Sequence, residues 1–224
     1  MNPRGLELTG AWFQVGGNLT AAIGTTRGFI GEEKIESDLV IVGSSLQALG
    51  YILQIVAYIN TKDEGKRGNQ DERMDNKSKE LEETGIELLA LGNISNVIGT
   101  YFNVNEQTQE NDYLIITGNS LQSIGAFLGV EAALREVNAI QRVIVLGNSM
   151  QSLGAGLQAY QGIYNISKEE KDNEDIGKDK EKEKENQRII GLIGIWIQAI
   201  GTVISAIGLT EIIEEERLES KKRH

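Results

Sequence analysis

The block Gly147-Asn148-Ser149-Met150-Gln151-Ser152-Leu153-Gly154 decides the fold, because its pattern recurs in each long uncharged segment of the chain. The block from Gly118 to Gly125 repeats it almost unchanged, and the block from Gly43 to Gly50 keeps both glycines and the glutamine. The shared repeat unit is Gly-x3-Gln-x2-Gly, and one of its six copies has asparagine in place of glutamine. The residues of the copies are Gly10, Gln14, Gly17; Gly43, Gln47, Gly50; Gly92, Asn96, Gly99; Gly118, Gln122, Gly125; Gly147, Gln151, Gly154; and Gly194, Gln198, Gly201.

Each copy lies in a window that contains no Asp, Glu, Lys or Arg. The windows are residues 8–26, 39–61, 88–105, 113–130, 143–167 and 189–210. An α-helix needs about 20 residues to cross the hydrocarbon core of a bilayer. The windows are close to that length, so each predicts one long helix.

Apolar residues inside the windows follow a helical period. In the fifth window Val143, Leu146, Met150 and Leu153 alternate by three and four positions, and the glycines and glutamine of the copy form the neighbouring stripe. Glycine inside a helix costs roughly 0.5–1 kcal/mol relative to alanine, so close packing has to offset it. We therefore interpret the glycine stripes as contacts between helices, with the amide side chains bridging to the facing helix.

The remaining face divides the windows into two kinds. In 39–61 and 189–210 it is also apolar, which is typical of a helix buried in protein or lipid. In 113–130 and 143–167 it is neutral and polar, and we expect it to meet water or a second protomer. The polar residues are Asn119, Ser120, Ser123, Asn148, Ser149 and Ser152.

These patterns predict an all-α protein, a bundle of six antiparallel helices packed through glycine and glutamine stripes. We expect helices one and two in 1–60, a charged linker in 61–84, helices three to five in 85–166, a second linker in 167–187, helix six in 188–216 and a charged tail in 217–224. The linkers mix both signs of charge with few apolar residues, so we expect them to be disordered or to extend the helices. The parts together form one bundle.

Composition excludes several classes of function. A net charge of −11 argues against nucleic-acid binding, which needs a basic face. Cysteine is absent and the one histidine is His224, so no catalytic residue, metal ligand set or cofactor site is predicted. The glycines do not follow the spacing of nucleotide-binding loops. We expect neither an enzyme nor a small-molecule substrate.

The stripes resemble glycine-zipper packing between membrane helices. The two Gly-Asn-Ser blocks at Gly118 and Gly147 are similar to those of uncharacterised repetitive proteins from spore-forming bacilli. This resemblance implies a bacterial, noncatalytic protein and no named activity.

Two functions remain open. The first is a membrane-associated bundle that packs or self-assembles through the repeated helix faces, with the lipid bilayer and other copies of itself as partners. The second is a soluble structural protein of a coat, shell or filament, cytoplasmic or spore-associated, whose neutral polar faces pair between protomers. We favour the first, because every window excludes charge.

Overall fold

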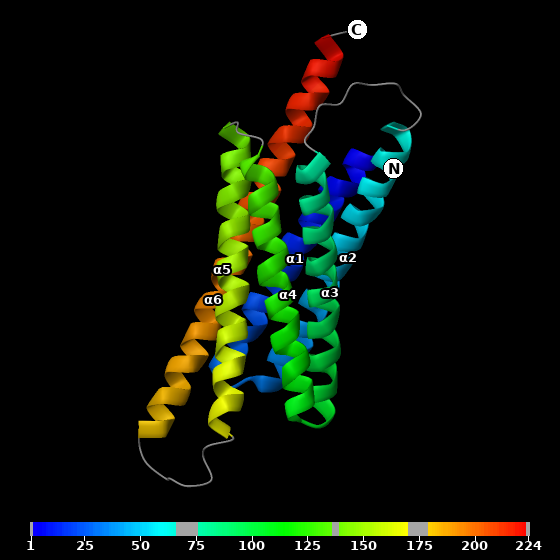
Figure 1. Cartoon of the computed structure of the whole chain (residues 1–224). Coiled ribbons are helices and arrows are strands. Elements are labelled where there is room, and N and C mark those ends of the chain that lie inside the picture. The colour runs from blue at the N-terminus through cyan, green and yellow to red at the C-terminus, as the bar shows by residue number, and fades with distance from the viewer. Residues whose placement is uncertain (1, 66–75, 136–138, 170–178, 223–224) are drawn as a thin grey trace.

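The computed structural model describes residues 2–65, 76–135, 139–169 and 179–222, and within these the prediction of six helices and no strands is confirmed. Figure 1 shows long helices standing side by side, with α3, α4 and α5 in front and α1, α2 and α6 behind them. The helices are α1 (Pro3–Phe29), α2 (Glu33–Gly65), α3 (Asn76–Asn105), α4 (Gln109–Leu134), α5 (Ala139–Glu169) and α6 (Asp179–Lys222).

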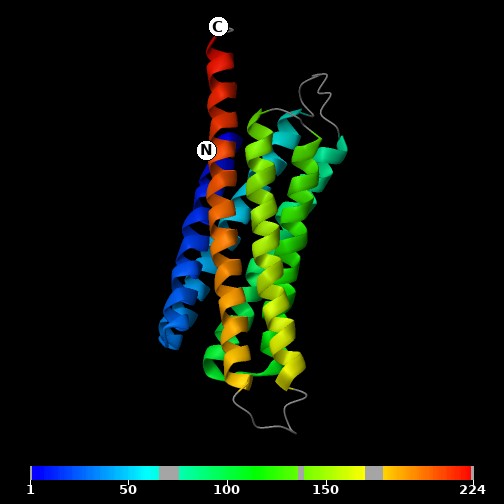
Figure 2. The same cartoon turned by 90° about the vertical axis from the view of Figure 1, so that its left-hand side faces the viewer.

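The helices form a closed ring. Each one contacts the helix before it and the helix after it in the sequence, and α6 contacts α1. Among the described residues, the backbones of helices that are not neighbours in the ring do not come close to one another. Only side chains therefore reach the interior of the ring. α6 is the longest helix, and its last turns project beyond the ring at the end where α1 begins (Figures 1 and 2).

Local signals explain where several helices begin. The side chain of Asn2 accepts a hydrogen bond of 2.7 Å from the backbone N–H of Gly5, and Pro3 fills the first helical position. Thr108 caps α4 in the same way through the N–H of Asn111. Between α1 and α2 the chain reverses at Gly31, whose φ of +94° is accessible to glycine without strain.

The helices extend into the segments predicted as linkers. α2 runs to Gly65, α3 begins at Asn76 and α6 begins at Asp179, so both predicted linkers are helical at their ends. The predicted tail continues α6 as far as Lys222. The centres of the linkers, 66–75 and 170–178, lie outside the described residues.

The core consists of small and amide side chains. Fully buried apolar residues are mostly alanines, such as Ala22, Ala155 and Ala199, and they are accompanied by buried Asn and Gln. The large apolar side chains of the windows lie mainly on the outside of the ring. Compared with an ordinary globular protein, this bundle therefore has its small and amide side chains inside and its large apolar side chains outside.

Candidate functional site

Glycines make the closest contacts between helices, in antiparallel pairs within three hairpins, α1/α2, α3/α4 and α5/α6. A Cβ placed on either glycine of a pair would lie within 2.8 Å of the carbonyl oxygen of the other, closer than real Cβ atoms approach. The pairs are Gly10 with Gly50, Gly17 with Gly43, Gly85 with Gly125, Gly92 with Gly118, Gly147 with Gly201 and Gly154 with Gly194. Each hairpin thus repeats one contact geometry, in which only glycine lets the two backbones meet.

On α3 the two glycines that contact α4 lie seven residues earlier in the sequence than the predicted copy of the repeat unit. Gly92 contacts Gly118, but the partner of Gly125 is Gly85. Gly99 lies instead against the carbonyl oxygen of Asn111, 2.8 Å from a Cβ placed on it. The α3 unit in contact is therefore Gly85-x3-Leu89-x2-Gly92, which sequence reasoning missed because Leu89 occupies the glutamine position. The seven-residue spacing of Gly85 and Gly92 was the signal in the sequence that could have identified this unit.

The central residue of each contacting unit is buried, and most are amides that bond to other helices. Gln14 Nε2 donates to Gln54 Oε1 at 2.8 Å across α1/α2, and Gln158 Nε2 donates to Gln198 Oε1 at 2.6 Å across α5/α6. Gln198 Nε2 in turn donates to Gln122 Oε1 on α4 at 2.5 Å. Because α4 and α6 are not neighbours in the ring, this last bond crosses the interior.

A second bond crosses the ring from α2 to α5. The hydroxyl of Tyr51 lies 3.5 Å from Gln151 Oε1, and Gln151 Nε2 donates to Ser205 Oγ at 3.0 Å and to Asn148 Oδ1 at 3.2 Å. Ser205 also donates to Asn148 Oδ1, at 2.8 Å. The interior near these residues is therefore filled by interlocked polar side chains.

The position after the second glycine of each contacting unit points inward. Its side chains are at most 3% exposed: Asn18, Tyr51, Asn93, Ala126, Ala155 and Thr202. Asn18 and Thr202 meet where α1 and α6 close the ring, and Asn18 Nδ2 donates to Thr202 Oγ1 at 2.9 Å. The sequence unit had not included this position.

Asn96, the central residue of the copy predicted on α3, also contributes to the polar interior. Asn96 lies beside Gly118, and its Nδ2 donates to Asn119 Oδ1 at 2.8 Å. Both side chains are buried. Asn96 therefore joins α3 to α4, one turn from the glycine contact.

The neutral polar faces of α4 and α5 face each other within the chain, which corrects the expectation that they meet water or a second protomer. Ser123 Oγ donates to the carbonyl oxygen of Ser152, and Ser152 Oγ donates to that of Ser123, both at 2.9 Å. Asn119 is buried, four of the six polar residues of these faces are partly buried, and only Ser149 is exposed. Serine is small enough to let α4 and α5 approach while satisfying its own hydroxyl.

The outer surface of the windows is apolar on every side of the ring. One residue from each helix, from α1 to α6, illustrates this, with exposed fractions between 41 and 57%: Ile23, Leu49, Ile98, Phe127, Leu153 and Ile200. We call the outward-facing residues of the charge-free windows the apolar belt. By length and composition, three helices of the described part could each cross a membrane, in Glu33–Thr61, Gln109–Leu134 and Glu185–Lys222.

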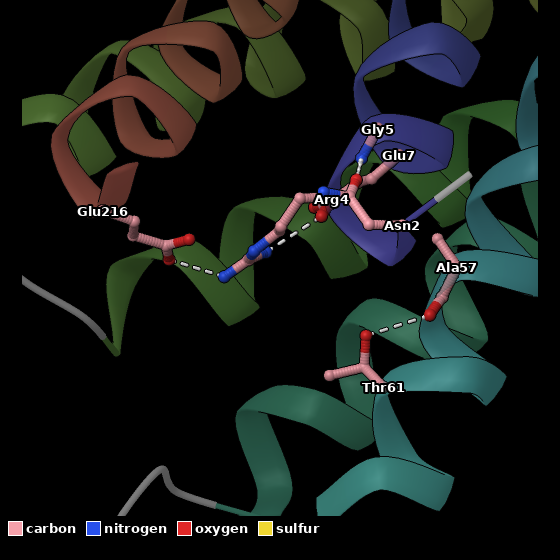
Figure 3. Close-up of polar contacts among 7 residues, drawn as sticks. All are labelled: Asn2, Arg4, Gly5, Glu7, Ala57, Thr61 and Glu216. Atoms are coloured by element: carbon pink, nitrogen blue, oxygen red, sulfur yellow. Dashed lines mark hydrogen bonds and ion pairs between the residues drawn. The ribbon is translucent and has the colours of Figure 1, made fainter. Parts of the chain in front are cut away.

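The charged residues lie outside the windows, toward the two ends of the ring, and at each end one of them connects α1 to α6. Arg4 bonds to Glu7 at 2.9 Å and to Glu216 at 2.5 Å, as Figure 3 shows. Partial burial lowers the pKa of Arg4, but the bonds to the two carboxylates outweigh it and leave the pKa above its ordinary value. At the opposite end Arg188 donates to the carbonyl oxygen of Gly28 at 2.7 Å.

No cluster suited to a metal ion occurs in the part of the chain that the structure describes. No three or more His, Cys, Asp or Glu side chains there are placed so that they could hold a metal ion together. Trp196, one of two tryptophans in the windows, donates its indole N–H to Thr26 Oγ1 at 3.0 Å and so serves the α1/α6 contact. The interior offers amides and hydroxyls, which bind by hydrogen bonding.

A family model described as "Family of unknown function (DUF6944)" matches residues 5–187, and the chain belongs to that family. The match includes α1 to α5 and ends where the last charge-free window begins. No curated protein and no solved structure is significantly similar to the chain.

Proposed function

We propose that this member of the family is a noncatalytic integral membrane protein whose helices cross the bilayer together as one closed ring. The observation that supports it is the placement of side chains in the charge-free windows. Ile, Leu, Val and Phe mainly face outward there, and Gly, Ala, Asn and Gln mainly face inward. A protein in water would gain stability from the opposite arrangement.

The closed ring explains how the more polar helices could enter a bilayer. Only α2, α4 and α6 are apolar enough to cross a membrane by composition. α1, α3 and α5 alternate with them, and the amides of these helices are buried against neighbours, as Gln14 is against Gln54. Lipid would meet chiefly the apolar belt, and few polar groups would be left in hydrocarbon without a partner.

The glycine contacts join helices of the same chain, and this changes which surface two copies of the protein could use to associate. Every glycine pair is already occupied by two helices of one chain, so self-association between copies would have to use the apolar belt. The soluble alternative requires other copies to cover that whole belt. Its original basis, a free neutral polar face on α4 and α5, is lost because Ser123 and Ser152 bond to each other.

Alkaline carbonate extraction of membranes from expressing cells tests the proposal. We expect the full-length protein to stay in the membrane pellet after the wash and to be released only by detergent. Recovery of the protein in the soluble fraction before or after the wash would overturn the membrane proposal. A peripheral protein of the same host is the control for complete stripping.

A further inference from the structure

Three tyrosines lie on the outside of the ring with about half of each side chain exposed. Tyr101 is 57% exposed, Tyr113 is 50% exposed and Tyr160 is 52% exposed. Their hydroxyls have no hydrogen-bond partner in the part of the chain that the structure describes. The other tyrosine hydroxyls of the chain donate hydrogen bonds within the protein: those of Tyr51, Tyr58 and Tyr164. The three exposed hydroxyls are therefore the ones that bond outside the chain.

All three exposed tyrosines lie toward the same end of the ring, where the apolar belt meets charged residues. α3 ends and α4 begins at this end, and α5 also ends there (Figure 1). Tyr101 lies about one turn before the end of α3. Tyr113 lies about one turn into α4 and directly follows Asp112. Both tyrosines therefore stand at the boundary of their charge-free windows.

The packing of α5 against α6 places Tyr160 at the same kind of boundary. Gln161, the next residue in the chain, contacts Gly191 on α6. Arg188 lies about one turn before Gly191, and it is the charged residue that precedes the last window. Tyr160 is therefore about one turn from the level at which charge begins on the neighbouring helix.

The chemistry of tyrosine suits such a boundary. Its ring is apolar, and its hydroxyl is unfavourable in hydrocarbon without a hydrogen-bond partner. Tyrosine and tryptophan are for this reason enriched where membrane proteins cross the lipid–water interface. Phe102 and Ile163, beside Tyr101 and Tyr160, are 50% and 52% exposed, so the surface around the two rings is itself apolar. Trp12 on α1, 46% exposed, is a comparable side chain toward the other end.

We propose that Tyr101, Tyr113 and Tyr160 form a collar that binds the ester and headgroup layer of a phospholipid bilayer. The inference rests on the proposed insertion of the ring in a membrane, and it names the part of the lipid that this end contacts. The rings lie at the edge of the hydrocarbon, and the hydroxyls bond to ester carbonyls and interfacial water. In their described residues α3 and α5 are not apolar enough to cross a membrane by composition, so the collar fixes their depth.

Spin labels can measure the depth of the collar, because the chain contains no cysteine. Nitroxides on single cysteines at Tyr101, Tyr113 and Tyr160 are compared with nitroxides at Leu153 in the apolar belt and Leu218 at the charged end, both 57% exposed. The full-length protein is reconstituted in vesicles of phosphatidylcholine and phosphatidylglycerol. Power saturation compares collisions with oxygen, which is enriched in hydrocarbon, and with a water-soluble nickel chelate. We expect the oxygen-to-nickel ratio at the collar to be several-fold below that at Leu153 and several-fold above that at Leu218.

The outcomes separate this proposal from the membrane proposal. Collar labels as deep as Leu153, or as accessible to nickel as Leu218, would overturn the collar and leave membrane insertion standing if Leu153 lies in hydrocarbon. Few collisions with either reagent would show that another copy covers these tyrosines, and would also overturn the collar. A label at Leu153 in water would contradict the membrane proposal itself, and the collar with it.

A second arm tests the tyrosine side chains themselves. A nitroxide at Val104, which is 53% exposed and about one turn after Tyr101, reports the depth of this end. In Tyr101→Leu/Tyr113→Leu/Tyr160→Leu we expect the label to move toward the hydrocarbon. The matched triple substitution by tryptophan keeps interfacial side chains and should leave the label at its original depth. The same depth in all three chains would contradict a collar that holds this end at the interface.

Discussion

At the scale of single residues, glycines of similar sequence context have different surroundings. A Cβ on Gly154 would lie 2.5 Å from both the backbone nitrogen of Gln198 and the carbonyl oxygen of Gly194. A Cβ on Gly16 would have no atom within 4 Å. The first glycine is required by contact between two backbones, and the second is tolerated in an exposed helix.

This difference predicts opposite effects of one substitution. Gly154→Ala should destabilise the protein by about 1–3 kcal/mol, because two helix backbones must separate. Gly16→Ala should stabilise it by roughly 0.5–1 kcal/mol through helix propensity alone. Thermal or denaturant unfolding of the purified protein measures both. Similar stabilities for the two variants would argue against close backbone contact at Gly154.

The hydrogen bond between Gln122 and Gln198 predicts that substitutions of the two residues have non-additive effects on the free energy of unfolding. Gln198→Leu removes the donor to Gln122 Oε1 and the side-chain acceptor of Gln158 Nε2, and it should cost about 1–3 kcal/mol. Gln122→Leu should cost a similar amount, and the double variant should cost clearly less than the sum of the two. Strictly additive free energies of unfolding would show that the amides do not interact across the ring.

At the scale of elements, sequence periodicity predicted the helices, and it could not predict their registers. Exclusion of charge over about 20 residues is a property of each segment alone, so it identified the windows without knowledge of partners. The register of α3 depends on the contact of Gly85 with Gly125 on another helix. The sequence pattern missed this unit because Leu89 occupies its glutamine position. The inward position of Asn18 and Asn93 likewise follows from ring closure, which no single helix encodes.

Closure of the ring within one chain is testable at the α1/α6 contact. Asn18 and Thr202 are hydrogen-bonded side by side although they lie at opposite ends of the sequence. Asn18→Cys/Thr202→Cys, in a chain that has no other cysteine, should form a crosslink within one chain under mild oxidation. Gel mobility after proteolysis between the helices detects it. Crosslinked dimers in place of crosslinked monomers would mean that α1 pairs with α6 of another copy.

At the scale of the whole molecule, the apolar belt makes the effect of a charge depend on position. Leu153 lies in the belt and Leu218 lies on the charged end of α6, and both are 57% exposed. In a bilayer Leu153→Lys should cost about 3 kcal/mol or prevent insertion, whereas Leu218→Lys should be nearly neutral. Yield in the membrane fraction and thermal stability in detergent compare them. Equal tolerance of both substitutions would indicate that water surrounds Leu153.

The arrangement of the two ends provides the most direct test of the central claim that the ring spans a membrane. Exposed residues Glu33 and Glu106 lie at one end of the ring, and Glu80 and Lys222 lie at the other. Single cysteines at these positions can be labelled with an impermeant maleimide in sealed vesicles of each orientation. We predict that the first two react from one side of the membrane and the last two react only from the opposite side. Equal reaction of all four from the same side of sealed vesicles would contradict the claim.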